Sequence, residues 1–535
     1  MKQKLKCENI LLIGVWLFLA IYMGVFVYLN MAKYAQHVDS DIASMALLSR
    51  EMWTDKTLTP DNWLTSTERF IISTSAVASV IYGITGSMQT AMGCSCVLVG
   101  GGFSAVLYLF GRRLGLSRLA SAAMLLALYA LPINGLRNEG QMVPFIMLVL
   151  FLFAGYYAPH SILLMLTILF YAYLKGADVM EQKALGIFGR ISWLFLFLAG
   201  MALSFGGERS LQMVILPLAI VEIITLYLDS KRFTTKLSRG RIRVTCFVGT
   251  MVLAFLVTTL YKGQVKYVTY LQNPQEAMHR LFETIPAAIL EGFGVNGNAI
   301  LGSFASVMQI LIWAFLALVG YGLVVIFRDK GKIPASQKTA LVVLLTTVGV
   351  AIIAITMTSV EPAHNYFTVA WFAAVLETGM LVDYFLREKS ALGVIIVLSV
   401  CIFALLNLGY TYKDAVTTKD NLKEHEEVAD FLVEEGIEYG YAEFWDADRI
   451  CLISDGAVTM GNVYRMDDPY MYWWLTSMQW YPPNLPEHMR TAYVVRIGKK
   501  SAFEEYFAMD PAMELVFENE VFAVYFSDTN HIVMQ

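Results

Sequence analysis

The sequence predicts an α-helical polytopic membrane protein that ends in a small α/β domain. Hydrophobic residues make up 57% of the 535 positions and charged residues only 16%, which is typical of chains with many membrane spans. Apolar segments of about 20 residues, the length that crosses a bilayer, recur through the region 1–412. From about residue 420 the composition changes abruptly to that of an aqueous domain, so we expect a membrane domain at 1–412 and a soluble domain at 413–535.

The charge distribution divides the chain in the same place. The net charge is −5, but the tail 413–535 carries 9 basic and 23 acidic side chains, whereas the membrane part carries 30 basic and 21 acidic ones. An acidic tail makes nucleic acid an unsuitable partner. The six cysteines fall mostly in apolar segments and predict no disulfide framework.

The first apolar segment, residues 10–31, follows Lys2, Lys4 and Lys6. It is too long for the core of a signal peptide and no small-residue cleavage motif follows it, so we interpret it as an uncleaved span with a cytoplasmic N-terminus. The loop at 32–87 then lies on the outer face of the plasma membrane.

The outer loop begins with the stretch HVDSDIASMALLSREMW, residues 37–53, in which Asp39 and Asp41 stand one residue apart beside His37. Apolar residues recur there at helical spacing, which predicts an amphipathic helix in the membrane interface that holds the two carboxylates at headgroup depth. These apolar positions are Ile42, Met45, Ala46, Met52 and Trp53. The alternative is that Ser40 or one Asp only caps the helix.

Later in this loop, Thr65 and Glu68 fit a capping box that opens the next helix, and Glu68 is a third outer-face carboxylate. Residues 70–85 are interpreted as a second juxtamembrane helix or the start of the second span. The spans expected after it are 88–110, 119–133, 161–174, 187–204, 211–228, 244–261, 303–327, 340–358, 366–386 and 391–409.

The segment 142–160 decides the topology. If it is re-entrant rather than spanning, the basic loops at 229–243 and 328–338 fall on the cytoplasmic side, as the positive-inside rule favours. We therefore expect about eleven spans and an extracellular C-terminal domain. In that domain, residues 425–436 and 501–509 predict helices, and 437–445, 491–498 and 520–527 predict strands.

On this topology a group of polar side chains gathers at the outer face. Such groups are costly near hydrocarbon and tend to be kept for function. A carboxylate can take a proton from an acceptor hydroxyl while cations stabilise a departing phosphate, which are the two tasks of an inverting sugar transfer from a polyprenyl phosphate. The catalytic candidates are Asp39 and Asp41, and the candidates for binding substrate or phosphate are His37, Glu68, His160, Arg209, His364 and Tyr366. Four of the binding candidates also have a structural alternative: Glu68 and His160 as caps, Arg209 as a side chain that snorkels to the interface, and His364 as a solvated turn residue.

The architecture resembles the GT-C glycosyltransferases, integral membrane enzymes that use lipid-phosphate sugars. The resemblance rests on the Asp39-Ser-Asp41 motif, on NWLTSTERF at 62–70, GYYAPH at 155–160 and Gly207-x-Arg209, and on YGYAEFW and WWLT in the tail. It implies a polyprenyl-phosphate-linked donor, an Asp base in the first outer loop, and a glycan, lipid or protein acceptor. The mannosyltransferase and aminoarabinose-transferase branches usually carry Asp-Glu where this chain has Asp39-Ser-Asp41.

Two readings from other classes compete with an enzyme. One is a transporter or flippase of lipid-linked glycans, which predicts deep charges and internal symmetry. The other is an envelope protein that binds polysaccharide through tail tryptophans, namely Trp445, Trp473, Trp474 and Trp480. A divalent cation, Mg²⁺ or Mn²⁺, is a further candidate partner of the two aspartates, because such ions take oxygen ligands.

Overall fold

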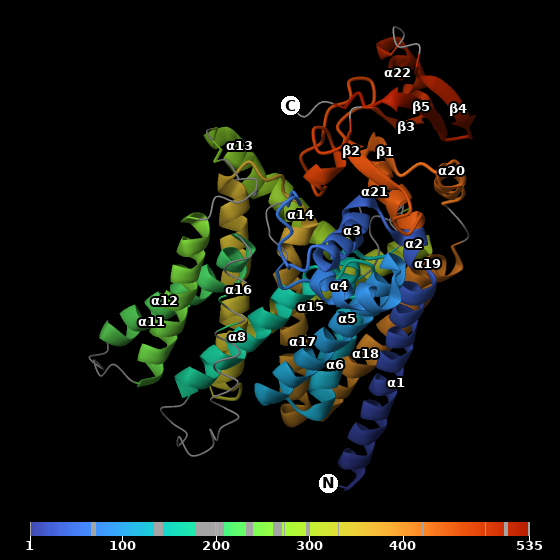
Figure 1. Ribbon diagram of the computed structural model, residues 1–535. Coiled ribbons are helices and arrows are strands. Elements are labelled where there is room, and N and C mark those ends of the chain that lie inside the picture. Colours follow the sequence, from blue (N-terminus) through green and yellow to red (C-terminus); the bar gives the residue numbers. More distant parts are fainter. Residues whose placement is uncertain are drawn as a thin grey trace.

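The computed structural model describes residues 2–535 except 66–70, 133–142, 177–197, 199–200, 202–207, 232–238, 261–269, 296–299, 419–421, 508–511 and 533–535, and the single residues 272, 330 and 487. The chain is mostly helical, and a bundle of helices carries a separate sheet-containing domain at one end (Figure 1). The N-terminus lies at the opposite end of the bundle from this domain.

The bundle contains the predicted membrane helices. Seven helical segments in the described part of the chain are long and apolar enough to cross a bilayer, and four shorter apolar helices accompany them. The long segments are built on α1 (Lys2–Ala32), α5 (Met88–Arg113), α11 (Leu216–Lys231), α15 (Phe304–Arg328), α16 (Ala335–Met357), α17 (Thr368–Glu388) and α18 (Ser390–Asn407). The shorter apolar helices lie in α4 (Thr74–Thr85), α6 (Arg118–Ala130), α8 (Ala158–Gly176) and α12 (Arg239–Leu260). Most of the expected span at 187–204 lies outside the described residues.

Short elements connect or extend these helices. At the outer end of α1 are α2 (Tyr34–His37) and α3 (Ser40–Thr54). Ahead of α11 are α10 (Glu208–Ser210) and the π-helical turn η3 (Leu211–Ile215). Between α12 and α17 lie α13 (Pro274–His279), η4 (Arg280–Thr284), α14 (Ile285–Gly292) and η5 (His364–Phe367), and α18 continues through η6 (Leu408–Tyr412) into α19 (Lys413–Thr417).

From the sequence, residues 142–160 are interpreted as re-entrant rather than spanning. The described part of this segment contains the short helix α7 and the start of α8. Helix α7 runs from Phe145 to Leu150, six residues, which rise about 9 Å where the hydrocarbon core measures about 30 Å. The chain then turns sharply, with Phe153 and Gly155 at positive φ, before α8 begins at Ala158. Helix α7 alone is therefore too short to cross the hydrocarbon core.

The C-terminal domain is built on a five-stranded mixed sheet of order β2-β1-β3-β5-β4. Strand β1 pairs in parallel with β2 and β3, and β5 pairs antiparallel with β3 and β4. The strands are β1 (Tyr439–Glu443), β2 (Thr459–Val463), β3 (His488–Arg496), β4 (Glu514–Glu518) and β5 (Phe522–Thr529). Three of them match the predicted strands, whereas β2 and β4 had no sequence prediction.

Three helices complete this domain, namely α20 (Lys423–Glu434), α21 (Phe444–Ile453) and α22 (Lys500–Tyr506), with the single turns η7 (Met478–Trp480) and η8 (Ile497–Lys499). Helices α20 and α22 overlap the two helices predicted at 425–436 and 501–509, and α20 ends where Gly436 adopts the left-handed conformation at φ +67°. Helix α21 begins inside the segment predicted as a strand, because the strand ends at Glu443.

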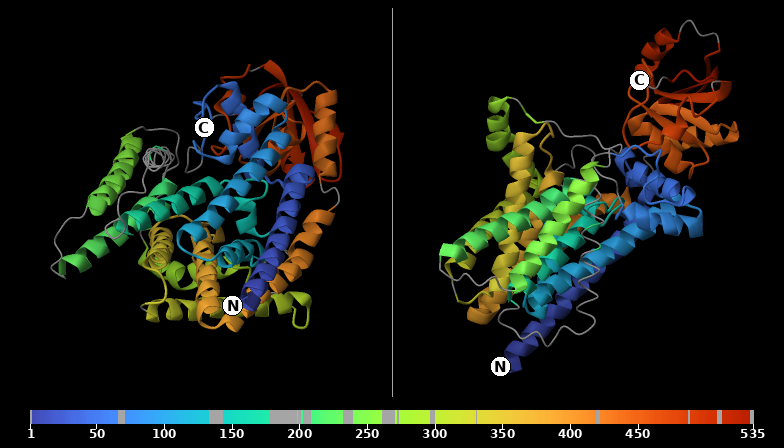
Figure 2. Two further views of the ribbon diagram at one scale, coloured as in Figure 1. Left: turned by 90° about the horizontal axis from the view of Figure 1, so that it is seen from below. Right: turned by 60° about the vertical axis from the view of Figure 1, so that its left-hand side comes forward.

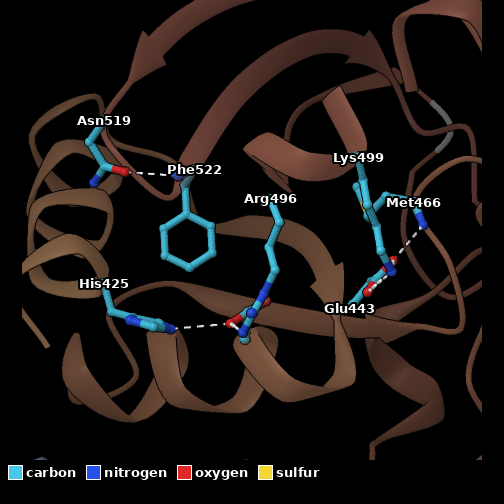
Figure 3. A network of polar contacts seen from close by, with 8 residues as sticks. His425, Glu443, Met466, Arg496, Lys499, Asn519 and Phe522 are labelled. Carbon is cyan, nitrogen blue, oxygen red and sulfur yellow. Dashed lines mark hydrogen bonds and ion pairs between the residues drawn. The ribbon is translucent and has the colours of Figure 1, made fainter. Parts of the chain in front are cut away.

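One buried carboxylate fixes the position of α21. Asp446 accepts two hydrogen bonds from the Arg496 guanidinium, at 2.7 and 2.8 Å, and lies 3.2 Å from His425 Nε2 (Figure 3). Burial raises the pKa of Asp446, but the hydrogen bonds from His425 and Arg496 outweigh it and hold the pKa below its usual value. This charge network ties α21 to α20 and β3.

The C-terminal domain rests on α3 and the adjoining ends of α1, α4 and α5, at the end of the bundle opposite the N-terminus, and leaves α8, α11 and α12 to one side (Figure 2). Residues 62–64 pair antiparallel with 476–478 through two backbone hydrogen bonds of 2.8 Å, Leu64 N–H to the Thr476 carbonyl and Met478 N–H to the Asn62 carbonyl. Asp455 accepts a hydrogen bond from the Met88 backbone at 2.7 Å. Segments from the early and the late part of the sequence therefore form the interface between the helical bundle and the C-terminal domain.

A glycine permits the closest approach across that interface. Gly456 has φ +80°, and a Cβ there would lie 2.5 Å from Arg50 Nη1 of α3. Arg50 also pairs with Glu51 at 3.3 Å and lies over the Trp480 ring at 5.7 Å. A side chain at position 456 would therefore displace the Arg50 guanidinium and would also be strained at this positive φ.

Candidate functional site

Asp39 is the N-cap of α3. It has extended backbone angles, and its Oδ1 accepts a hydrogen bond from the Ile42 backbone N–H at 2.9 Å. The capping role that the sequence offered as an alternative is thus real for this residue. It occupies one carboxylate oxygen and holds the side chain at the positive end of the helix.

Asp41 lies in the first turn of the same helix and does not cap it. Its side chain is exposed, yet burial of its surroundings and the neighbouring charge of Asp39 raise its pKa to about 6, while a hydrogen bond from Trp474 opposes them. Asp41 is thus reachable from solvent, while the surrounding protein disfavours its charged form. The same is true of Asp39, which is exposed although burial raises its pKa.

The helix that carries both aspartates is covered by protein on most of its circumference. The residues from Ile42 to Ser49 are all buried, because α4 and α5 pack on one side and α21 of the C-terminal domain on the other. The predicted apolar face is correct, and Trp53 is its one partly exposed member at 37%. Helix α3 is therefore buried mainly by other parts of the protein.

The C-terminal domain contributes a cation that the sequence did not reveal. Arg449 in α21 is close enough to Asp39 to lower the pKa of that carboxyl, against the burial that raises it. Arg449 makes no ion pair within 4 Å among the described residues, and the other carboxylate that acts on it, Asp446, already holds Arg496 and His425. No sequence signal placed Arg449 here, because its helix was not predicted.

A second cation enters from α10. The Arg209 guanidinium lies over the Tyr157 ring, 4.1 Å from its centroid. Tyr156 interacts electrostatically with Arg209, Asp39 and Asp41, and Tyr366 interacts with Arg209. The predicted candidates Asp39, Asp41, Arg209 and Tyr366 are thus joined through the two tyrosines that precede α8.

The three predicted histidines lie around this centre with other contacts. His37 Nε2 is 3.0 Å from the Ala415 carbonyl, and its ring lies against Phe153, so it links α2 to α19. His364 Nδ1 is 3.5 Å from Glu291, and its ring meets Phe145 edge-on at 4.4 Å. His160 is 3% exposed in the first turn of α8.

Two predictions from the sequence remain: Glu68 as a binding residue, and a divalent cation held by Asp39 and Asp41. Glu68 lies outside the described residues. Among the described residues, no group of three or more His, Cys, Asp or Glu side chains is arranged to hold a metal ion. Asp39 and Asp41 are two carboxylates, and one oxygen of Asp39 is already used by the helix cap.

The fold and the site together define a helical membrane protein in which the segment after α1 and the C-terminal domain meet over two accessible aspartates. The structure is similar to that of ArnT from Cupriavidus metallidurans, solved in the apo state and bound to undecaprenyl phosphate. The similarity covers 96% of this chain and 97% of ArnT, with 13% sequence identity and TM-scores of 0.45 for the bound form and 0.44 for the apo form.

ArnT is a GT-C aminoarabinose transferase. At this TM-score the likeness assigns neither residue roles nor an activity. No protein-family model matches the chain. The search of curated proteins found no match.

Proposed function

We propose that this protein is a membrane glycosyltransferase of the inverting type, which moves a sugar from a polyprenyl-phosphate-linked donor to an acceptor hydroxyl. The observation that carries the proposal is Asp41, an accessible carboxylate beside a capped partner and within the same electrostatic environment as Arg209. A general base is most effective when its pKa lies near the working pH, and the pKa of Asp41 is raised to about 6.

The two aspartates have different roles in this proposal. Asp41 takes the proton from the acceptor hydroxyl as the hydroxyl oxygen attacks the anomeric carbon of the donor. Asp39, held by the α3 N-terminus and facing the charge of Arg449, orients the acceptor. Because Asp39 already spends one oxygen on the cap, it is the poorer proton acceptor of the pair.

The phosphate that leaves with its lipid is assigned to Arg209, with Tyr366 beside it. A guanidinium keeps its charge at any working pH and can bind two phosphate oxygens at once. Its position over the Tyr157 ring fixes the plane of the fork. Such a cation stabilises the negative charge that develops on the leaving phosphate in the transition state.

The outer face is assigned as the side of reaction. The aspartates and the C-terminal domain lie at the end of the bundle opposite the N-terminus (Figure 1). The N-terminus carries Lys2, Lys4 and Lys6, and such basic segments stay in the cytoplasm. The acceptor is then a molecule of the cell envelope.

The test is sugar transfer from a polyprenyl-phosphate donor by the purified full-length protein in proteoliposomes. Asp41→Asn keeps the shape and the hydrogen bond from Trp474 but removes the basicity, so the rate should fall at least about a hundredfold. Asp55→Asn, at the other end of α3 where Asp55 is the exposed C-cap, should retain the wild-type rate. Full activity of well-expressed Asp41→Asn would refute the base assignment.

A further inference from the structure

An exposed cluster of aromatic rings adjoins the candidate site on the C-terminal domain. After β2 ends at Val463, the chain doubles back through hydrogen bonds from Tyr464 N–H to the Tyr470 carbonyl, 3.1 Å, and from Tyr472 N–H to the Asn462 carbonyl, 2.9 Å. This turn and the start of α21 present the five rings of what we call the aromatic surface: Trp445, Tyr464, Tyr470, Tyr472 and Trp473.

Ring contacts link four of these five side chains, Trp445, Tyr464, Tyr470 and Tyr472. Tyr464 stacks on Tyr470 at 5.4 Å between centroids with 21° between the planes, and it meets Tyr472 at 5.8 Å. Buried Phe444 joins Tyr472 to Trp445 through contacts of 5.6 and 5.2 Å. The contacts fix the rings relative to one another, so a ligand would meet a preformed surface.

Large parts of these rings nevertheless face solvent. Trp445 is 57% exposed, Tyr464 54% and Trp473 46%. Clustered exposed aromatics in a folded domain mark interaction sites more often than chance packing does. Tyr and Trp are also the side chains that combine an apolar face with a polar edge, which suits a ligand with both kinds of surface.

The aromatic surface leads directly to the carboxylates. Trp474 hydrogen-bonds to Asp41, and Tyr472 interacts electrostatically with the same carboxylate. Three consecutive residues, 472 to 474, therefore extend from the exposed rings to the proposed base. A molecule held on the rings would present its next unit to Asp41.

The charges around the rings favour a neutral ligand over an anionic membrane surface. The arginine of this turn, Arg465, is already paired with Asp467, and the next residue, Asp468, is exposed. An anionic lipid headgroup needs available cations, whereas a sugar ring offers apolar C–H faces for stacking and hydroxyls for the tyrosine edges.

We propose that the aromatic surface is the acceptor subsite and that the acceptor is a carbohydrate, whose rings stack on Trp445 and Tyr464 while a hydroxyl of its terminal sugar reaches Asp41. This inference rests on the proposed glycosyl transfer, because it names the acceptor of that reaction. It makes the C-terminal domain the part of the protein that selects what receives the sugar.

The kinetic test titrates the acceptor, supplied as the polysaccharide fraction of the source cell envelope, with the full-length protein in proteoliposomes. Tyr464→Ala and Trp445→Ala should raise the apparent KM for this acceptor about fivefold, since one aromatic contact contributes about 1 kcal/mol, with kcat and the donor KM unchanged. Leu515→Ala is the matched control, because Leu515 is a 42% exposed apolar residue of β4, at the opposite edge of the sheet from β2. Loss of kcat with an unchanged acceptor KM, or no change, would overturn the inference.

A binding test separates this inference from the proposed reaction. Asp41→Asn protein in detergent is applied to a glycan array that includes hexoses, pentoses and amino sugars, where it should bind and the double variant with Tyr464→Ala should not. Binding without any transfer by the wild type would refute the reaction but keep the carbohydrate site. Transfer by a protein whose surface variants behave as wild type would refute the site alone, and so would an array with no binding.

A lipid test addresses the other class of ligand. In nanodiscs of brominated phosphatidylcholine, the wild type and Trp445→Phe should lose the same absolute tryptophan fluorescence to the bromine quencher. If the quenching is smaller in Trp445→Phe, Trp445 lies within the acyl chains. The aromatic surface would then be a membrane contact and the inference would fall.

Discussion

The rings of Trp63 and Trp480 meet edge to face with their centroids 5.9 Å apart, although the first belongs to the outer loop after α3 and the second to the C-terminal domain. Both are buried, at 1% and 5% exposure. The contact lies beside the backbone pairing of 62–64 with 476–478. It joins the membrane bundle to the domain that covers its candidate site.

We expect Trp480→Ala to loosen this junction. Truncating a buried tryptophan costs about 3–5 kcal/mol through lost contacts and the cavity left behind, and here the cost falls on the interface. Limited proteolysis should release the C-terminal domain earlier than in the wild type. Trp313→Ala, which truncates a half-exposed tryptophan of span α15, should not change the cleavage rate, and equal rates in both variants would contradict the role of the ring pair.

The orientation can be read from two native cysteines. Cys451 is buried in α21 and Cys7 is exposed near the start of α1, at opposite ends of the structure. In intact cells of the Trp480→Ala variant, a membrane-impermeant maleimide should label Cys451 as the domain loosens, and Cys7 only after permeabilisation. The reverse order would place the C-terminal domain in the cytoplasm and exclude an outer-face reaction.

The pH dependence of transfer should report Asp41. Because the pKa of Asp41 is raised to about 6 and the base must be ionised, kcat/KM should be constant above that pH and fall as the pH drops through it. Asp39→Asn removes the neighbouring negative charge that contributes to the raised pKa, so the limb should move to lower pH. If kcat/KM falls at the same pH in Asp39→Asn as in the wild type, a group other than Asp41 titrates.

The cap itself is separable from catalysis. Asp39→Asn keeps an oxygen that can accept from the Ile42 N–H, whereas Asp39→Ala removes it, at a cost of about 1 kcal/mol. Differential scanning fluorimetry should therefore give a lower Tm for Asp39→Ala than for Asp39→Asn. Equal Tm values for the two variants would mean that the cap contributes little to stability.

Arg209→Lys tests the phosphate assignment. Lysine keeps the charge but loses the planar fork and its stacking on Tyr157, 4.1 Å away, so the donor KM should rise about tenfold, the loss of one charged hydrogen bond. Arg490→Lys, an exposed residue paired with Glu435, is the control and should leave the donor KM unchanged. An unaltered donor KM in Arg209→Lys would show that Arg209 does not bind the donor phosphate.

The sequence predicted those parts of the site that depend on local pattern. Helix α3, its apolar face and the position of Asp39 and Asp41 at its start follow from capping chemistry and helical spacing over a few residues. The helical membrane class and the terminal α/β domain follow from composition. These features require no knowledge of which distant segments meet.

The parts contributed by distant segments could not be predicted. Arg449 and the indole of Trp474 reach the aspartates only because residues 62–64 pair with 476–478 and α21 packs on α3, and nothing in the spacing of one sequence encodes those contacts. Strand β2 escaped prediction because TMGNV alternates weakly and contains a glycine. The role of Asp39 could not be decided from the sequence, because a capping residue and a catalytic residue look alike in sequence.

The pairing of 62–64 with 476–478 has a consequence for biogenesis. The outer loop is among the first segments to leave the ribosome, and its partner strand follows more than 400 residues later, which takes about 20–80 s at ordinary rates of synthesis. During that interval α21 of the C-terminal domain does not yet pack on α3, and Asp39 and Asp41 lack their contacts with Arg449 and Trp474. A nascent or truncated chain therefore lacks the complete candidate site until the C-terminal domain has been synthesised and packs against α3.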